Sequence, residues 1–134
     1  MFESINVVRK KLKHGIFHYF KNDIYIGRSL SEYGEWSEDE VRLIKQISKP
    51  EDNIIEIGSN IGTHTIPIAK HLSNKGFIYA IEPQPQNYKV LLKNINENNL
   101  NNVKTFKVGA SIENGEAYIN KFNESERDNF GDAK

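Results

Sequence analysis

The chain has 134 residues, with 18 Lys and Arg against 18 Asp and Glu, no cysteine, and 37% hydrophobic residues. This length predicts one domain with its own core, and the lack of cysteine excludes disulfides, thiolate zinc sites and cysteine nucleophiles. Zero net charge argues against a dedicated nucleic-acid-binding protein, which usually carries a basic excess. No apolar run approaches the roughly 18 residues of a membrane span, and residues 1–8 lack the apolar core expected of a signal peptide. We therefore expect a cytoplasmic protein with neither a nucleic-acid nor a membrane partner.

The first third of the chain predicts a basic segment, a hairpin and a helix. Residues 1–15 end in a run of Lys, Arg and His, which we expect to be solvated. Residues 16–20 and 24–26 are aromatic and β-branched runs separated by turn residues, so 16–31 predict a β-hairpin. Residues 37–48 predict a helix, with Ser37 and Glu40 in the spacing of a capping box.

Strands and helices alternate in the middle of the chain. Residues 54–57, 77–81 and 103–108 predict strands, and residues 62–73 and 85–98 predict the helices between them. This order is typical of an α/β fold with a Rossmann-like parallel sheet. Asn114 and Gly115 predict a tight turn with a returning strand at 117–119. We expect a cofactor-binding domain at 16–120 and a polar, flexible tail at 121–134.

The loop after the first parallel strand is the most informative motif. Open α/β sheets bind ligands at the carboxyl ends of their strands, and Glu56 stands there, where a carboxylate can face an ammonium group. Gly58 allows a sharp turn, Asn60 tolerates a left-handed conformation, and Gly62 allows close packing of the helix. The dinucleotide fingerprint needs glycines at the third and sixth positions, which are Asn60 and Thr63, so that motif fails.

A second carboxylate ends the next strand. Glu82 lies 20 residues after Gly62, where it can accept hydrogen bonds from the two hydroxyls of a ribose. Residues 83–85 contain no basic side chain that would hold a 2′-phosphate. Alone, Glu82 is equally well explained as a solvated carboxylate, but together with the upstream loop it indicates a ligand with an adenosine-type ribose.

Taken together, these motifs resemble the FkbM-type methyltransferases. The resemblance rests on residues 34–38, 54–65 and 80–87, and residues 108–115 resemble the segment that follows the third strand of that family. It implies a Rossmann-like fold, S-adenosylmethionine as cofactor, and O-methylation of a hydroxyl on a small molecule or sugar. The resemblance also implies the cofactor-binding positions: Glu56, Gly58, Ser59, Asn60 and Gly62 at the methionine end, Glu82 and Pro83 at the ribose, and Gly109 and Ala110 beside the adenine.

The sequence departs from that family in two respects. Glu56 stands where aspartate is commoner, and the later strands of a seven-stranded sheet have no counterpart. We therefore expect an incomplete sheet, and an unpaired edge at 54–57 that the N-terminal hairpin, a second copy or a partner subunit covers. The alternative readings are a truncated, non-catalytic Rossmann-like module that binds a nucleoside or a partner, and a nucleotide-dependent oxidoreductase.

No catalytic residue follows from the sequence. His64 and Glu35 are the candidate general bases, but a histidine in a first helical turn is more often a packing residue, because the helix N-terminus disfavours its cation. Trp36 is expected in the core. The other three histidines share no ligand spacing, so no metal site is predicted.

Overall fold

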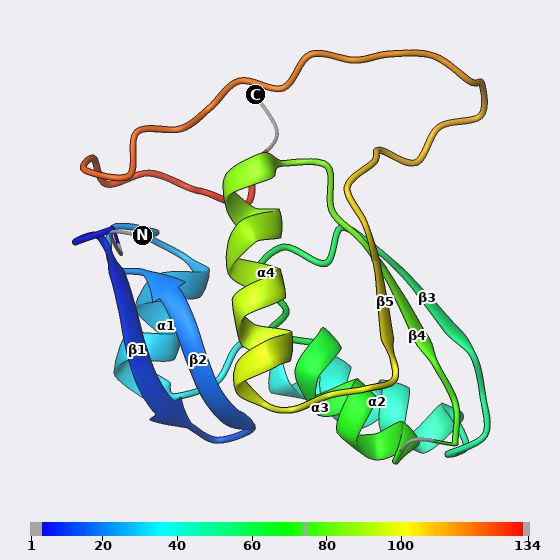
Figure 1. Ribbon diagram of the computed structural model, residues 1–134. Coiled ribbons are helices and arrows are strands. Elements are labelled where there is room, and N and C mark those ends of the chain that lie inside the picture. Colours follow the sequence, from blue (N-terminus) through cyan, green and yellow to red (C-terminus); the bar gives the residue numbers. More distant parts are fainter. Residues whose placement is uncertain (1–3, 74, 133–134) are drawn as a thin grey trace.

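The computed structural model describes residues 4–73 and 75–132, and it contains two sheets (Figure 1). An antiparallel hairpin pairs β1 (Val7–Leu12) with β2 (Gly15–Phe20), and a parallel sheet has the strand order β3-β4-β5. In chain order the remaining elements are α1 (Ile26–Tyr33), α2 (Glu38–Ile47), β3 (Ile54–Ile57), α3 (Thr65–Leu72), β4 (Ile78–Ile81), α4 (Pro85–Glu97) and β5 (Val103–Phe106).

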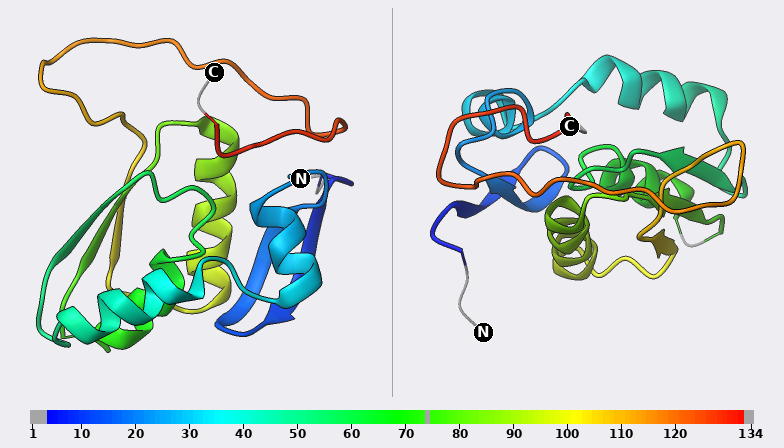
Figure 2. Two further views of the ribbon diagram at one scale, coloured as in Figure 1. Left: turned by 180° about the vertical axis from the view of Figure 1, so that it is seen from behind. Right: turned by 90° about the horizontal axis from the view of Figure 1, so that it is seen from above.

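The parallel sheet is covered on one face. Ile54, Ile78 and Val103 lie side by side in register and pack with Leu72 of α3 into one apolar cluster. The helices and the hairpin all lie to that side of the sheet (Figure 2). Along each strand, the neighbouring side chains point to the opposite face of the sheet. On that face Ile57 is 68% exposed.

The predicted α/β fold is confirmed. The strand at 54–57 is found with the predicted bounds, and the other parallel strands and the helix before β5 differ only by one or two residues at their ends. Short apolar runs carry this part of the prediction, because such runs are typical of parallel strands buried on both faces. The expected burial of the strand at 54–57 on both faces is wrong, since Ile55 and Ile57 are 69% and 68% exposed.

The predicted position of the hairpin is wrong. The basic stretch forms β1, which pairs with β2, whereas residues 26–33 form α1. The carboxylate of Asp23 accepts hydrogen bonds from the backbone N–H groups of Tyr25 and Gly27, at 3.2 and 3.1 Å, which starts the helix. A Cβ on Gly27 would lie 2.1 Å from the Phe20 carbonyl oxygen, so α1 packs directly against the backbone at the end of β2. This tertiary packing overrides the local β propensity of the segment.

Two smaller predictions also differ from the structure. Ser37 precedes α2 but has a φ of 48° and makes no side-chain capping bond, so the capping box does not form. The returning strand at 117–119 is absent as well, and Ile112 and Tyr118 in this segment are fully exposed. The apolar side chains on either side of the predicted turn at 114–115 pack against no surface, so no strand forms after the turn.

The C-terminal segment is less loose than its composition predicts. Phe130 is 2% exposed, and its ring stacks on Phe122 with centroids 4.3 Å apart. Both rings also meet Phe20 of β2 edge-on. The segment therefore returns across the molecule to the hairpin (Figure 1). The domain boundaries themselves stay predictions.

The outer strand β3 is not covered by the hairpin. β3 stands at the edge of its sheet, next to β4, while the hairpin lies against α4. The hairpin is thus excluded as the cover for this edge, because β1 and β2 pair only with each other in the described chain. A second copy or a partner subunit at this edge stays a prediction.

Two asparagines of α4 join the hairpin to the helix. Asn94 accepts a hydrogen bond from the His18 N–H at 2.6 Å and donates to the His18 carbonyl at 3.0 Å and to the Ile61 carbonyl at 2.7 Å. Asn98, one turn later, bonds both backbone groups of Ile16 in the same way. Together they satisfy the outer edge of β2, which would otherwise expose unpaired groups.

Glu97 adds charged contacts at the same junction. Its carboxylate accepts from Arg9 at 2.5 Å and lies 3.0 Å from the Nε2 atom of His18. These hydrogen bonds, first that of Arg9 and then that of His18, lower the pKa of Glu97 to about 2.

We expect Asn94→Ala to destabilise the fold strongly. The substitution leaves three buried backbone groups without partners, and each such group costs about 1–3 kcal/mol, so the free energy of unfolding should fall by roughly 3 kcal/mol or more. Urea denaturation followed by circular dichroism measures this. Asn96→Ala, at an exposed position of the same helix, is the matched control and should change stability little. Equal stability of the two variants would contradict the role of Asn94.

Candidate functional site

The carboxyl ends of β3 and β4 are tied together by the loop that follows β3. The backbone N–H groups of Gly58 and Ser59 both donate to the Ile81 carbonyl, at 2.9 Å each. Ile61, from the same loop, is 2% exposed and packs in the cluster that contains Phe20 and Leu30. The loop is therefore anchored at one end to the sheet and at the other to the core.

Three residues of this loop have a positive φ, a conformation that Asn60 was expected to tolerate. The φ values are 79° at Gly58, 52° at Asn60 and 95° at Gly62. A Cβ on Gly62 would lie 2.9 Å from Leu91 of α4, so this glycine allows the loop to approach α4. A Cβ on Gly58 would meet no atom within 4 Å, so Gly58 borders open space where a ligand can approach the backbone.

Glu82 is held at the end of β4 by the backbone of two loops. It is 6% exposed. One carboxylate oxygen accepts from the Asn60 N–H at 2.7 Å, and the other accepts from the Gln84 N–H at 3.0 Å. Each oxygen keeps acceptor capacity beyond these bonds. The structure thus fixes the carboxylate in one orientation while leaving it able to accept from a ligand.

Glu56 lies close to Glu82 and is fixed in a similar way. The hydroxyl of Thr65 donates to its Oε1 atom at 2.5 Å. Burial raises the pKa of Glu56 above its ordinary value, against the opposing effect of hydrogen bonds such as that from Thr65. Burial also raises the pKa of Glu82, and the nearby Glu56 charge adds to that rise. Two carboxylates with raised pKa values at neighbouring strand ends mark a candidate binding site.

The two positions expected beside the adenine follow β5 at the same edge of the sheet. A Cβ on Gly109 would lie 4.0 Å from the Cβ of Pro83, so these two residues are neighbours, and Gly109 and Ala110 are both exposed. The C-terminal segment also reaches this site, because a Cβ on Gly131 would lie 2.9 Å from the side-chain amide nitrogen of Asn60.

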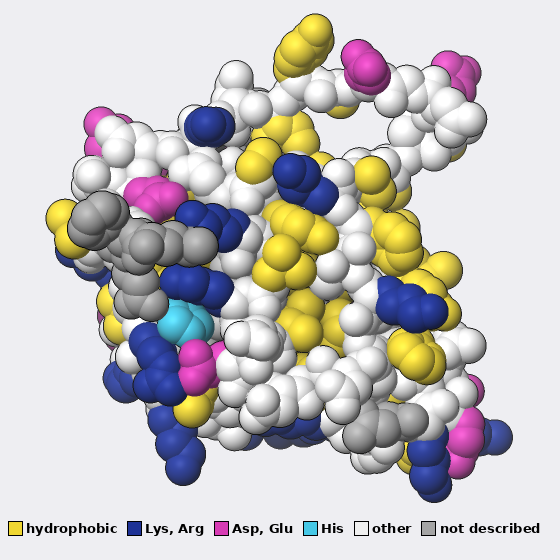
Figure 3. Space-filling view, in the orientation of Figure 1, with side chains coloured by type: hydrophobic (Ala, Val, Ile, Leu, Met, Phe, Trp, Pro, Cys, Tyr) yellow, Lys and Arg dark blue, Asp and Glu magenta, His cyan; other side chains and the backbone are white. Residues whose placement is uncertain are grey.

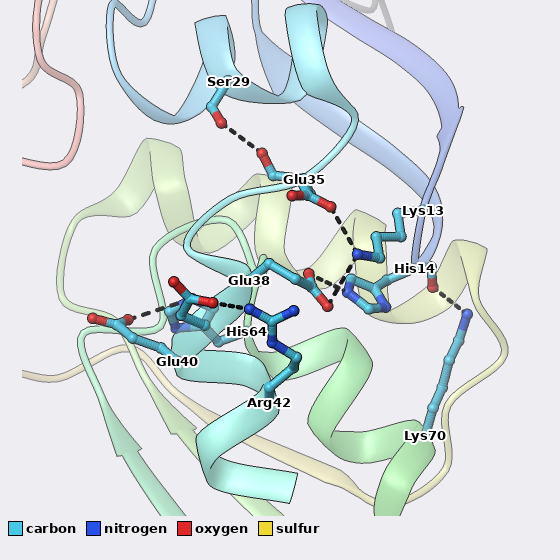
Figure 4. A network of polar contacts seen from close by, with 10 residues as sticks. Lys13, His14, Ser29, Glu35, Glu38, Glu40, Arg42, His64 and Lys70 are labelled. Atoms are coloured by element: carbon cyan, nitrogen blue, oxygen red, sulfur yellow. Dashed lines mark hydrogen bonds and ion pairs between the residues drawn. The ribbon is translucent and has the colours of Figure 1, made fainter.

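Each of the two candidate bases has a charged neighbour (Figure 4). Glu35 pairs with Lys13 at 2.8 Å. His64 precedes α3, and its Nε2 atom, which makes no hydrogen bond, lies 3.6 Å from a carboxylate oxygen of Glu40. Trp36 packs against the hairpin cluster, as expected. None of these contacts identifies a base, and the base stays unassigned.

Two further residues that were not predicted shape the site. Thr65, in the first turn of α3, holds Glu56. Gln84 caps α4, because its side chain accepts from the N–H groups of Gln86 and Asn87. A polar residue directly before a proline is the signal that could have identified this cap, since proline favours the first helical position.

No group of three or more His, Asp or Glu side chains suited to a metal ion occurs in the part of the chain that the structure describes. Within the same residues, no helix is both long and apolar enough to cross a bilayer.

The parallel sheet, the glycine-containing loop and the two strand-end carboxylates form a candidate nucleoside site on a Rossmann-like fold, the fold of class I methyltransferases. The particular family follows from sequence comparison. The profile of the TRM5/TYW2 methyltransferase domain matches residues 24–117, and the chain belongs to that family.

Known relatives are similar over part of their length. The tRNA(Phe) (4-demethylwyosine(37)-C(7)) aminocarboxypropyltransferase of Methanocaldococcus jannaschii is 38% identical over 71 residues, which are 51% of this chain and 28% of the relative. The structure of M. jannaschii TYW2 in complex with AdoMet matches with a TM-score of 0.57 and 25% identity, over 78% of this chain and 44% of that one. The aTrm5–tRNALeu complex matches with a TM-score of 0.56 and 22% identity, over 77% and 28%. The chain thus spans less than half the length of these relatives.

The expectation of a small-molecule acceptor and no nucleic acid is contradicted. The curated relative is named for a tRNA substrate, and one structural relative was solved with tRNA bound. Net charge was a poor guide, because a total of zero says nothing about where the charges lie.

We expect Gly62→Ala to weaken the fold at the loop. A side chain here meets Leu91 and forces a residue with a Cβ into a left-handed conformation, which together cost about 2 kcal/mol. Thermal unfolding measures the loss. Gly115→Ala is the control, because its Cβ would meet no atom within 4 Å, and its effect should stay within about 0.5 kcal/mol. An unchanged melting temperature for Gly62→Ala would show that the loop can move away from α4.

Proposed function

We propose that the protein is an S-adenosylmethionine-dependent methyltransferase that acts on tRNA. The observation that carries this proposal is the Glu82 carboxylate, which is buried at the end of β4 and fixed by the N–H groups of Asn60 and Gln84. It stands where a Rossmann-like sheet presents an acidic group to a ribose.

The residues at the strand ends fit this cofactor. Glu82 would accept hydrogen bonds from the ribose hydroxyls, with Pro83 as its neighbour in the chain. Glu56 would hold the ammonium group of the methionine end, together with the loop residues. Gly109 and Ala110 would hold the adenine. The loop residues proposed to bind the methionine end, in addition to Glu56, are Gly58, Ser59, Asn60 and Gly62.

The acceptor is proposed from family membership and from what the relatives act on. The chain's match to the TRM5/TYW2 methyltransferase domain and the tRNA named for its relatives both support an RNA acceptor. The FkbM-type resemblance is a finer assignment than this match gives, and it stays a prediction.

A second candidate reaction is transfer of the aminocarboxypropyl group. It is favoured by the 38% identity to a relative named for that activity. When bound, the cofactor supplies carbon atoms activated by a sulfonium: displacement at the methyl carbon leaves S-adenosylhomocysteine, and displacement at the aminocarboxypropyl carbon leaves 5′-methylthioadenosine. The protein's contribution in either case is to align one of these carbons with the acceptor atom and to exclude water.

The by-product distinguishes the two reactions. The protein is incubated with S-adenosylmethionine and total tRNA, and the nucleoside products are separated by chromatography and mass spectrometry. The proposal expects S-adenosylhomocysteine and methylated tRNA. Formation of 5′-methylthioadenosine would favour the second candidate, and cofactor binding without any transfer would favour a non-catalytic nucleoside-binding module. Binding of NAD in place of S-adenosylmethionine would refute both reactions.

We expect Glu82→Gln to weaken S-adenosylmethionine binding about 10- to 100-fold. Hydrogen bonds to a charged group are worth about 1.5–3 kcal/mol, and the amide can no longer accept at both positions. Isothermal titration calorimetry measures the affinity, and a thermal melt checks that the variant is folded. Glu51→Gln, in the turn before β3, is the control. Equal affinity of both variants would remove the ribose assignment.

The affinity for S-adenosylmethionine should also depend on pH. Both carboxyls must be ionised to accept from the ribose or to face the ammonium group, and burial raises the pKa of each. Affinity should therefore fall as the pH drops through these raised values, at a higher pH than an ordinary glutamate would give. Calorimetry across a pH series tests this, and a constant affinity down to pH 4.5 would contradict it.

A further inference from the structure

We propose that a lysine-lined hollow between the hairpin, α4 and the C-terminal segment binds phosphate groups of the RNA substrate. This inference rests on the proposed function, since it names the surface that holds the same acceptor. We call this hollow the lysine hollow; its volume is about 500 Å³, and its lining residues include Phe20, Val90, Lys89, Lys93 and Lys121.

The lysine hollow combines an apolar floor with a cationic rim. Phe20 and Val90 are buried and form the floor. Lys89 and Lys93 lie one turn apart on α4, and Lys121 comes from the opposite wall, in the C-terminal segment. Lys89 and Lys121 are exposed. Three ammonium groups from two walls around one hollow suit an anion with several oxygens, such as a phosphodiester.

One acidic side chain lines the lysine hollow together with the lysines. Glu124 accepts hydrogen bonds from Ser4 at 2.7 Å and from Gln86 at 3.2 Å and keeps its negative charge, because both donors are neutral. In the described chain, no ion pair joins Glu124 to Lys89 or Lys121. With these two lysines set against one carboxylate, the hollow keeps an excess of positive charge.

The basic character continues along the hairpin, beyond the reach of a small ligand. Figure 3 shows Lys and Arg side chains gathered over the hairpin and α4, whereas hydrophobic side chains gather over the parallel sheet. At the turn of the hairpin a second hollow is lined by four lysines, Lys11, Lys13, Lys45 and Lys70. Of these, Lys13 is already paired with Glu35 and Glu38. A band with lysine-lined hollows at both ends fits a polyanion better than a single free phosphate.

The place of the lysine hollow also fits an acceptor strand. Its lining includes Pro85 and Gln86, which open α4 only three and four residues after Glu82. A phosphate bound on the rim would thus lie near the proposed cofactor site, so the hollow can position RNA relative to the reacting group.

A salt-dependent binding measurement tests the inference. The native chain and the double variant Lys89→Gln/Lys121→Gln are titrated against a fluorescently labelled tRNA at several salt concentrations. If each lysine neutralises one phosphate, loss of both reduces the slope of log K against log salt by about 1.4 and weakens binding about 25-fold at 0.1 M salt. The control is Lys49→Gln/Lys75→Gln, two exposed lysines near the start of β3 and β4, which should bind RNA as the native chain does.

The outcomes separate this inference from the proposed function. We expect both double variants to keep native affinity for S-adenosylmethionine, because none of the four lysines is assigned to that site. If the native chain binds tRNA and Lys89→Gln/Lys121→Gln binds equally well with the same salt slope, the inference is overturned and the proposed function stands. If the native chain binds S-adenosylmethionine but not tRNA, the proposed acceptor fails and the inference fails with it. Binding of phosphatidylserine vesicles through the same two lysines, with tRNA binding unchanged, would also overturn it.

Discussion

The buried side chain of Asn94 joins the three parts of the molecule on which the candidate site depends. Its amide bonds both backbone groups of His18 in β2 and the carbonyl of Ile61 in the loop after β3. One residue of α4 thereby holds the hairpin, the helix and the loop in a single arrangement. Because Asn94 is fully buried, water cannot replace these hydrogen bonds. If Asn94 were removed, each backbone group that lost its partner would cost its full desolvation free energy.

The position of the loop decides what the strand ends can bind. Once Ile61 is fixed, the preceding residues turn back over the sheet, and the N–H of Asn60 reaches the carboxylate of Glu82. Glu56 is held from the other side by Thr65. Two acidic groups that would repel each other in isolation are thus kept at one edge of the sheet, next to exposed backbone at Gly58. This geometry suits a ligand with both a cationic end and a ribose.

Local patterns predicted the part of the fold that depends on short-range rules. Apolar runs identified the parallel strands, and residue type predicted the sharp turn at Gly58 and the left-handed conformation that Asn60 tolerates. The hairpin was misplaced because its first strand, Val7–Leu12, is half basic, and because the helix after it is started by Asp23 against its own β propensity. Asn94 carries no signal at all in the sequence, since its partners are 33 and 76 residues away.

The acceptor was mispredicted for a similar physical reason. Lys89, Lys93 and Lys121 line one hollow only because the C-terminal segment returns to α4, and the stacked rings of Phe122 and Phe130 hold that return. In the linear chain Lys121 lies 28 residues after Lys93, and the chain as a whole carries no net charge. Charge distribution on a folded surface, which composition does not report, is what decides whether a polyanion can bind.

The proposed site requires the strand-end carboxylates to hold a nucleoside at the edge of the parallel sheet. A crystal structure of the chain with S-adenosylhomocysteine would show this. We expect the ribose hydroxyls within hydrogen-bonding distance of Glu82, the amino group facing Glu56, and the adenine between Pro83 and Gly109. A nucleoside bound elsewhere on the molecule, or at this edge with its ribose turned away from Glu82, would contradict it.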